Sequence, residues 1–254
     1  MPTLHVHFLP THVAPEQLAG SVVIVIDLLR ASSTICQALA SGATCVMPFL
    51  EIDDARRAAE QFDRAAIVLG GERHGRIIDG FDLGNSPLEY SPVAVAGRPL
   101  LFTTTNGTRA LHHARLARRT LVGCALNRAA IAAAVANEPQ IDILCAGTDG
   151  AITDEDIYAA GAIADSLVRS GNADGWKLNR NARTAHSRWN DILAMAGWTP
   201  MSLVEAFAKT LEKTPGGRNI LEIGHGIDLP ACAELDILPI VPELNHATGE
   251  IRPA

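Results

Sequence analysis

Hydroxyl and amide side chains that suit anion binding follow one apolar run of this sequence. The stretch TTTNGTRAL, residues 103–111, lies directly behind the run PLLF and before a helix-like pattern. The first N–H groups of a helix have no internal partners, so such a junction offers backbone donors beside the hydroxyls. The sequence therefore predicts a phosphate-binding turn made of Thr104, Thr105, Asn106, Gly107 and Thr108.

Carboxylates follow two other apolar runs. Asp27 ends the run VVIVI, where a carboxylate is costly unless it is paired or binds a metal. It is a candidate for catalysis or metal ligation, and the alternative is that it pairs with Arg30 or caps the next helix. Glu72 and Arg73 follow LGG, and they suggest a metal ligand beside an arginine that holds oxyanions, or an ordinary ion pair.

Two further acidic segments supply weaker ligand candidates. Asp82 precedes LGNSP, a turn that backbone chemistry alone explains. Asp154, Glu155 and Asp156 begin a helix, where the helix dipole favours acidic residues whatever their function. Carboxylate and water ligands favour Mg²⁺ or Mn²⁺ over zinc. A magnesium-assisted phosphoryl reaction is the chemistry that combines these carboxylates with the phosphate-binding turn.

Other well-known motifs do not occur in the sequence. The nine histidines include no HExxH spacing, and His5, His7, His112 and His113 fit exposed or packing positions better than a metal site. The glycines of LGGERHG form neither a dinucleotide fingerprint nor a Walker A loop, so we do not expect a kinase. VVIVID is similar to the nucleophile strand of the haloacid dehalogenase superfamily, but Leu29 stands where that motif needs a second aspartate.

Short β-branched runs alternate with longer alanine-rich runs, which is typical of strand-helix-strand units. We predict a layered α/β/α fold with a mostly parallel or mixed sheet, in one domain over residues 1–254 with a helical excursion at 172–215. Ligands of such sheets bind at the carboxyl ends of the strands. The tail, with GRNILEIG and ILPIVPEL, is expected to rejoin the sheet. The other expected strands are at 4–9, 21–27, 44–50, 65–72, 99–104, 120–125 and 141–147.

Composition narrows the class of protein. The 254 residues are 48% hydrophobic and only 19% charged, which is enough to bury a sizeable core. A net charge of −7 argues against a general nucleic-acid binder. No run approaches the length of a membrane span, and the five cysteines show no CxxC spacing, so we expect a soluble cytoplasmic protein with reduced thiols.

Six segments together resemble the 2-phosphosulfolactate phosphatase family. They are IDLLRASSTICQAL, LGGERHG, GFDLGNSP, TTTNGTRAL, CAGT followed by EDIYAAGAI, and the closing GGRNILEIGHGIDLPACAELD. They span nearly the whole chain in the family's order. The region from Trp176 to Trp198 is the least typical part.

This resemblance implies a magnesium-dependent acid phosphatase that converts 2-phospho-3-sulfolactate to 3-sulfolactate and phosphate in coenzyme M biosynthesis. Catalysis is then expected from Asp27, Arg30 and Arg73. Mg²⁺ ligands are expected among Asp27, Glu72, Asp82, Glu155 and Asp156. Phosphate contacts are expected from Ser33, Asn85, Ser86, Thr104, Thr105, Asn106, Gly107 and Thr108.

Several alternatives remain open at the level of sequence. A metal-bound water attacks phosphorus directly, or Asp27 attacks and forms an aspartyl-phosphate. The substrate is phosphosulfolactate or another small phosphorylated hydroxy acid. A sensor that binds phosphate without chemistry is the runner-up, and the retained carboxylates argue against it because they repel an anion. The sequence does not fix the oligomeric state.

Overall fold

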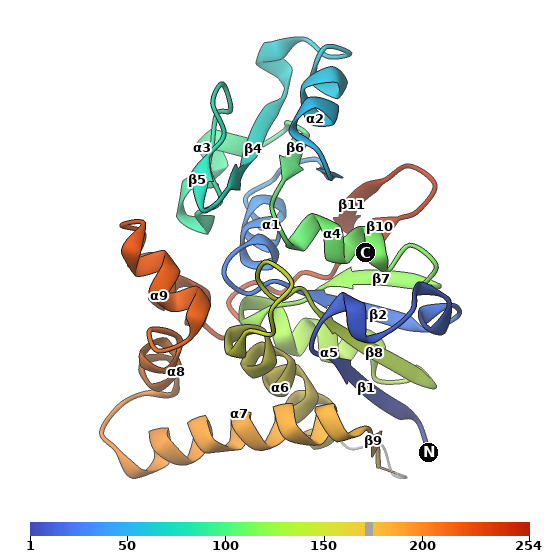
Figure 1. Cartoon of the computed structure of the whole chain (residues 1–254), viewed down its shortest axis with the longest axis vertical. Helices are drawn as coiled ribbons and strands as arrows, with labels where there is room; N and C mark the ends of the chain where they lie inside the picture. The colour runs from blue at the N-terminus through green and yellow to red at the C-terminus, as the bar shows by residue number, and fades with distance from the viewer. Residues whose placement is uncertain (171–174) are drawn as a thin grey trace.

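The structure is a computed structural model that describes residues 1–170 and 175–254. One 11-stranded sheet runs through it in the order β5-β4-β6-β3-β11-β10-β7-β2-β8-β1-β9 (Figure 1). The strands are β1 (Thr3–His7), β2 (Val22–Ile26), β3 (Val46–Phe49), β4 (Val68–Arg73), β5 (Arg76–Ile77), β6 (Leu100–Thr103), β7 (Arg119–Val122), β8 (Gln140–Cys145), β9 (Lys177–Leu178), β10 (Pro242–Asn245) and β11 (Glu250–Pro253).

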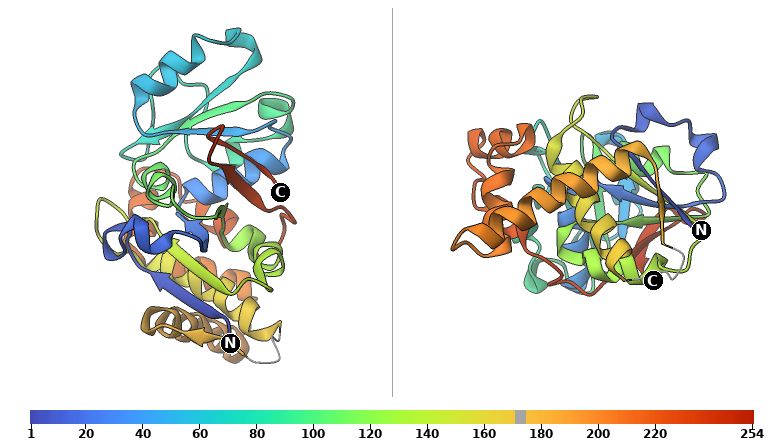
Figure 2. Two further views of the ribbon diagram at one scale, coloured as in Figure 1. Left: turned by 90° about the vertical axis from the view of Figure 1, so that its right-hand side faces the viewer. Right: turned by 90° about the horizontal axis from the view of Figure 1, so that it is seen from below.

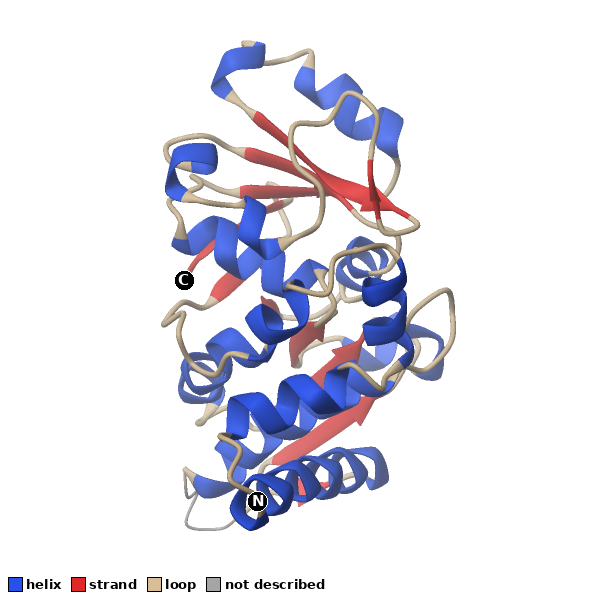
Figure 3. Ribbon diagram, turned by 90° about the vertical axis from the view of Figure 1, so that its left-hand side faces the viewer, coloured by secondary structure: helices blue, strands red, loops and turns tan. Residues whose placement is uncertain are grey.

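Two groups of parallel strands make up the sheet. β7, β2, β8 and β1 pair in parallel, and so do β3, β6 and β4. The antiparallel hairpin of β10 and β11 joins the two groups, because β10 pairs with β7 and β11 pairs with β3. Figure 3 shows the groups as the upper and lower parts of the molecule, with strands in red. All strands predicted between residues 4 and 147 are present, which confirms the α/β fold.

Helices cover both faces of the β7-β2-β8-β1 group. A Cβ added at Gly123, just after β7, would meet Ile24 of β2 together with side chains of α5 and α6. On the opposite face, the Thr120 hydroxyl donates to the carbonyl of Ala114 at the end of α4. The layered α/β/α arrangement is therefore confirmed, and Figure 2 shows it from two sides. The helices are α1 (Ala31–Ala40), α2 (Ile52–Ala59), α3 (Pro92–Val95), α4 (Gly107–His113), α5 (Arg128–Val135), α6 (Asp154–Arg169), α7 (Arg180–Trp198), α8 (Leu203–Leu211), α9 (Pro215–Glu222) and α10 (Asp228–Ala233).

The excursion near residues 172–215 is largely helical, as predicted, where the structure describes it, but it also contains the two-residue strand β9, which was not predicted. It consists mainly of α7 and α8, and residues 171–174 lie outside the described part. The segment GRNILEIG, predicted as a strand, is instead largely helix α9. Pro215 at its first turn and the Thr214 hydroxyl, which accepts from the Gly217 N–H at 3.0 Å, set that helix start. The tail does rejoin the sheet, through β10 and β11.

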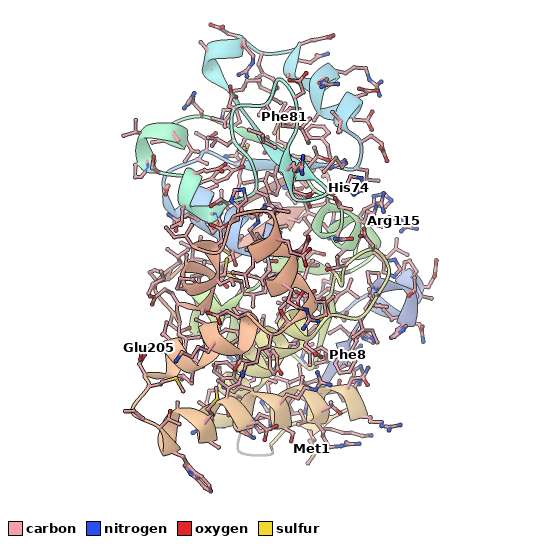
Figure 4. All side chains as sticks on the ribbon, turned by 60° about the vertical axis from the view of Figure 1, so that its left-hand side comes forward. Met1, Phe8, His74, Phe81, Arg115 and Glu205 are labelled. Atoms are coloured by element: carbon pink, nitrogen blue, oxygen red, sulfur yellow. The ribbon has the colours of Figure 1, made fainter. Side chains whose placement is uncertain are left out.

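The core is one large apolar cluster with a smaller one in the upper part. The smaller cluster gathers around Phe81, labelled in Figure 4, with Ile67 and Leu101. β2 is buried at all five positions because it lies inside the sheet, between β7 and β8. Among the described residues, none of the helices has the length and apolar character needed to cross a membrane.

Candidate active site

A cleft opens at the carboxyl ends of the parallel strands, where open α/β sheets bind ligands. Loops that follow β2, β4, β6 and β8 form its walls together with α9. Its cavity volume is about 60 Å³, so it suits a small ligand. The lining residues are Asp27, Leu29, Arg30, Glu72, His74, Gly75, Asn85, Thr105, Asn106, Thr148, Asp149, Gly216, Asn219 and Ile220.

Asp27 lies directly after β2 and is only 8% exposed. Its Oδ1 accepts from the Ala31 N–H at 3.3 Å, and its own N–H donates to the Ser32 hydroxyl at 2.8 Å. Burial, followed by the charge of Glu72, raises the pKa of Asp27 to about 7. The carboxyl group therefore changes its charge near neutral pH.

Gly107 lets the turn after β6 approach Asp27. A Cβ at this position would lie 2.9 Å from Asp27 Oδ2 and 2.5 Å from the Ala31 Cβ. These separations are shorter than atoms tolerate, so a residue with a side chain would push the turn away. This close approach explains the glycine of the Asn-Gly pair.

Glu72 and Arg73 are neighbours in β4 but point to different places. Glu72 lines the cleft, and its two oxygens accept from the Thr105 N–H at 2.8 Å and the Gly75 N–H at 2.7 Å. Arg73 is not among the lining residues. Its guanidinium donates to the Leu50 carbonyl, the Glu72 carbonyl and the Thr103 hydroxyl, each at 2.8 Å. The structure thus holds Arg73 outside the cleft by contacts with two backbone carbonyls and the Thr103 hydroxyl.

Glu155 and Asp156 begin α6 and are both buried. Asp156 accepts from the N–H groups of Leu28 at 2.8 Å and Gly147 at 3.0 Å, and so ties the loops after β2 and β8 together. Burial and the nearby Asp27 raise its pKa well above the usual range. Burial also raises the pKa of Glu155. Two negative charges are therefore unfavourable here without a counter-ion.

Several oxygens of the site fit a divalent cation. Glu155 Oε2 and Asn85 Oδ1 are buried and have no hydrogen-bond partner among the described residues. The negative charges of Glu72 and Glu155 both raise the pKa of Asp27. The oxygens of these carboxylates do not converge as closely as ligand atoms of a closed metal cage, so an ion here would keep water ligands, as Mg²⁺ commonly does.

Arg30 lies at the edge of the cleft in a buried ion pair. Its Nη1 donates to Asp228 Oδ2 at 2.6 Å, and its Nη2 to the Gly75 carbonyl at 3.3 Å. The Ser86 hydroxyl donates to Asp228 Oδ1 at 2.5 Å, so Ser86 supports the ion pair. The sequence prediction missed Asp228. It lies in the closing segment that carries the family resemblance, but no local pattern announces a partner 198 residues away.

The structure divides the predicted phosphate-binding residues into two sets. Thr105, Asn106 and Asn85 line the cleft. The hydroxyls of Ser33, Thr104 and Thr108 are instead engaged with backbone groups: Ser33 donates to the Leu28 carbonyl, Thr108 donates to the Thr104 carbonyl, and Thr104 Oγ1 accepts from the Thr108 N–H.

Two groups do not line this cleft. Asp82 pairs with Arg64 at 2.6 Å and accepts from the Leu69 N–H, and it is not a lining residue. Within residues 1–170 and 175–254, the only three side chains whose potential ligand atoms lie within 4.8 Å of one another are His5, His7 and Asp142. They form a group that could hold a metal ion, and Asp142 was not among the predicted site residues.

Comparison with known proteins points to one family. The model of the 2-phosphosulpholactate phosphatase family matches residues 7–247. The chain is 39% identical to a probable 2-phosphosulfolactate phosphatase of Symbiobacterium thermophilum, over 89% of this chain and 92% of that protein. It is 36% identical to the one of Caldanaerobacter subterraneus, over 88% of each, and 37% identical to one of Prochlorococcus marinus, over 91% and 93%.

Proposed function

The chain belongs to the 2-phosphosulfolactate phosphatase family and is a phosphoric monoester hydrolase, and on this premise we propose that it hydrolyses 2-phospho-3-sulfolactate in a Mg²⁺-dependent reaction. The products are 3-sulfolactate and phosphate. Water supplies the oxygen that bonds to phosphorus, and the 2-oxygen of sulfolactate leaves and takes up a proton. The reaction occurs in the cleft after β2, β4, β6 and β8.

The observation that carries this proposal is the crowding of carboxylates around Asp27. The charges of Glu72 and Glu155 both raise the pKa of Asp27. The charge of Asp27 in turn raises the pKa of Asp156. The arginine of the cleft, Arg30, is already paired with Asp228. A phosphate would be repelled from this surface, so substrate binding requires an added cation.

Asp27, Glu72 and Glu155 are the side chains that would hold Mg²⁺. When bound, Mg²⁺ supplies positive charge that offsets the phosphate oxygens during phosphoryl transfer. Asp156 is a poorer ligand, because it does not line the cleft as Glu72 does, and because both of its oxygens accept backbone N–H groups whereas Glu155 Oε2 is unpartnered. Thr105 and Asn106 also line the cleft, with Thr105 hydrogen-bonded to Glu72, and they orient the phosphate.

Asp27 is the group that acts on the reacting atoms. Its ionised carboxylate can accept a proton from the attacking water, or it can itself attack phosphorus. An acid-quenched single turnover with substrate carrying radioactive phosphate separates the two roles. Label retained on the protein, and absent in Asp27→Asn, indicates an aspartyl-phosphate. Label found only as free phosphate indicates attack by water.

The sulfonate of the substrate needs a second polar contact. His74 and Asn219 line the cleft from the β4–β5 turn and from α9, and we assign the sulfonate to them. His74 and Gly75 form a two-residue turn with φ values of 53° and 75°, which holds the imidazole at the rim. Figure 4 labels His74 near the junction of the upper and lower parts of the molecule.

Phosphate release by chelator-treated protein, with and without Mg²⁺, tests the proposal. The substrates are phosphosulfolactate, phospholactate, phosphoglycolate and an aryl phosphate. We expect Mg²⁺-dependent turnover that is fastest with phosphosulfolactate. A preference for another acid would replace the substrate and keep the chemistry. If none of them is turned over and phosphate binds tightly, the proposed enzymatic activity is wrong and the protein is a phosphate sensor.

Asp82→Asn is the matched comparison for the metal ligands, because Asp82 was predicted as a ligand but lies outside the cleft with an exposed partner, Arg64. We expect this variant to need no more Mg²⁺ than the parent. If Asp82→Asn needs more Mg²⁺ than the parent, Asp82 is a metal ligand after all.

A further inference from the structure

His5 and His7 lie on the face of β1 that is turned away from the apolar core. Burial alternates along the strand, with Leu4 and Val6 fully buried and the histidines partly exposed. In the parallel pairing of β1 with β8, His5 is the register partner of Asp142. Because partners in adjacent strands point to the same face, the three side chains meet above the sheet.

The separations of their polar atoms resemble those of metal ligands. Asp142 Oδ1 lies 2.8 Å from His7 Nε2 and 3.3 Å from His5 Nδ1, and all three ligand atoms lie within 4.8 Å of one another. In a tetrahedral site with bonds of 2.0–2.1 Å, neighbouring ligands are about 3.3 Å apart. Small rotations of the two imidazoles would therefore complete the geometry.

A hydrogen bond from a neighbouring side chain fixes the orientation of the Asp142 carboxylate. Asp142 Oδ2 accepts from Gln140 Nε2 at 2.9 Å, which leaves Oδ1 directed at the histidines. A ligand with a fixed orientation is a common feature of metal sites.

We propose that His5, His7 and Asp142 bind a divalent transition-metal ion such as Zn²⁺, at a site distinct from the phosphatase cleft. Two imidazole nitrogens and one carboxylate oxygen suit Zn²⁺ and its neighbours, whereas Mg²⁺ prefers oxygen ligands alone. The side chain of His5 is 35% exposed, so water can occupy the remaining position.

The bound ion would join two strands that are far apart in the sequence. β1 lies beside β8 near one end of the sheet, next to the two-residue strand β9. An ion shared by His5, His7 and Asp142 connects the start of the chain to the strand that leads into the cleft. Binding to the folded protein alone raises its stability.

Titration of untagged, chelator-treated protein with Zn²⁺ and Co²⁺ in excess Mg²⁺ and a thiol-free reductant tests the site. We expect one Zn²⁺ to bind with micromolar or tighter affinity, intense visible bands of four-coordinate Co²⁺, and a Tm raised by roughly 5 °C at a hundredfold excess over Kd. His5→Ala and His7→Ala should each abolish the bands. Gln140→Ala should weaken Zn²⁺ binding roughly tenfold.

His186→Ala is the matched control. His186 Nε2 lies 3.1 Å from Asp165 Oδ1, so this pair has one histidine beside an aspartate where the proposed site has two. It should leave Zn²⁺ affinity and the Co²⁺ bands unchanged. Circular dichroism establishes that each variant is folded. The inference is overturned if the parent binds no Zn²⁺ under these conditions, or if folded His5→Ala and His7→Ala variants bind it as the parent does. The three side chains would then be a hydrogen-bonded cluster only.

Discussion

Asp27 and Asp142 are buried aspartates of adjacent strands, yet their surroundings have opposite effects. Asp27 follows β2 at the edge of the cleft, where burial and the charge of Glu72 raise its pKa to about 7. Asp142 lies inside β8, where hydrogen bonds from His7 and Gln140 outweigh burial and lower its pKa. Burial alone therefore does not decide the charge of a carboxyl group; its neighbours do.

The comparison also separates two kinds of metal chemistry. The cleft gathers oxygen ligands that repel one another, and the face of β1 offers nitrogen beside a single carboxylate. The first arrangement attracts a hard cation and a phosphate together. The second favours a transition metal without a role in phosphoryl transfer.

The largest expected effect is that of Asp27→Asn, which tests whether crowding around Asp27 serves catalysis. We expect kcat to fall roughly a thousandfold, because the group that acts on water or phosphorus is lost. The measurement is Mg²⁺-dependent phosphate release. Asp53→Asn is the control, since the side chain of Asp53 is 79% exposed on α2. Activity of Asp27→Asn close to that of Asp53→Asn would remove Asp27 from the mechanism.

A third buried aspartate extends the comparison to a guanidinium partner. Asp228→Asn leaves the buried Arg30 without its counter-charge, and we expect the free energy of unfolding to fall by about 3 kcal/mol or more. Urea unfolding measures this loss. Asp82→Asn breaks the exposed pair with Arg64 and should cost less than about 1 kcal/mol. Equal losses of unfolding free energy in the two variants would contradict the expectation that a buried ion pair costs more to break than an exposed one.

Gly107→Ala tests how closely the phosphate-binding turn must approach Asp27. The added Cβ would lie 2.5 Å from Ala31 and 2.9 Å from Asp27 Oδ2, so we expect the turn to shift and kcat/KM to fall roughly tenfold. Gly197→Ala is the control, because a Cβ at this helical position meets nothing within 4 Å. It should leave activity intact and raise stability by about 0.5 kcal/mol. Unchanged activity of Gly107→Ala would show that the turn tolerates displacement.

A further prediction concerns the pH dependence of the stability of metal-free protein. Because the pKa of Asp27 is raised on folding from 3.8 to about 7, the folded state binds the extra proton in this range. Stability should therefore fall as the pH rises through this interval, which is the opposite of the contribution of Asp142. Thermal unfolding in chelator across this interval measures it. Asp27→Asn should weaken the fall, and an identical slope in the variant would assign the effect to other groups.

Much of the fold could be predicted from the sequence because its signals are local. Runs such as VVIVI and IDILC are short, β-branched and apolar, and both became buried strands. GRNILEIG also contains β-branched and apolar residues, but a proline and a threonine cap just before it start a helix instead. Composition alone does not separate a short strand from a short amphipathic helix.

The candidate site was only partly predictable, because side-chain direction is not a local property. Glu72 and Arg73 are consecutive, and alternation along β4 sends one into the cleft and the other toward Leu50. Asp82 and Asp27 both follow apolar residues, but Asp82 ends at the surface beside Arg64. The catalytic and metal-binding roles of these residues stay predictions that the experiments above address.

The sequence by itself determined the layered α/β/α fold, the family, and the polar turns at the ends of the strands, since each depends on residues near one another in the chain. Only the tertiary structure decided which of these turns share a cleft, that Arg30 is neutralised by Asp228, and that His5 and His7 meet Asp142. Those pairings join residues more than a hundred positions apart. Sheet register and helix packing bring them together, and no local pattern encodes either.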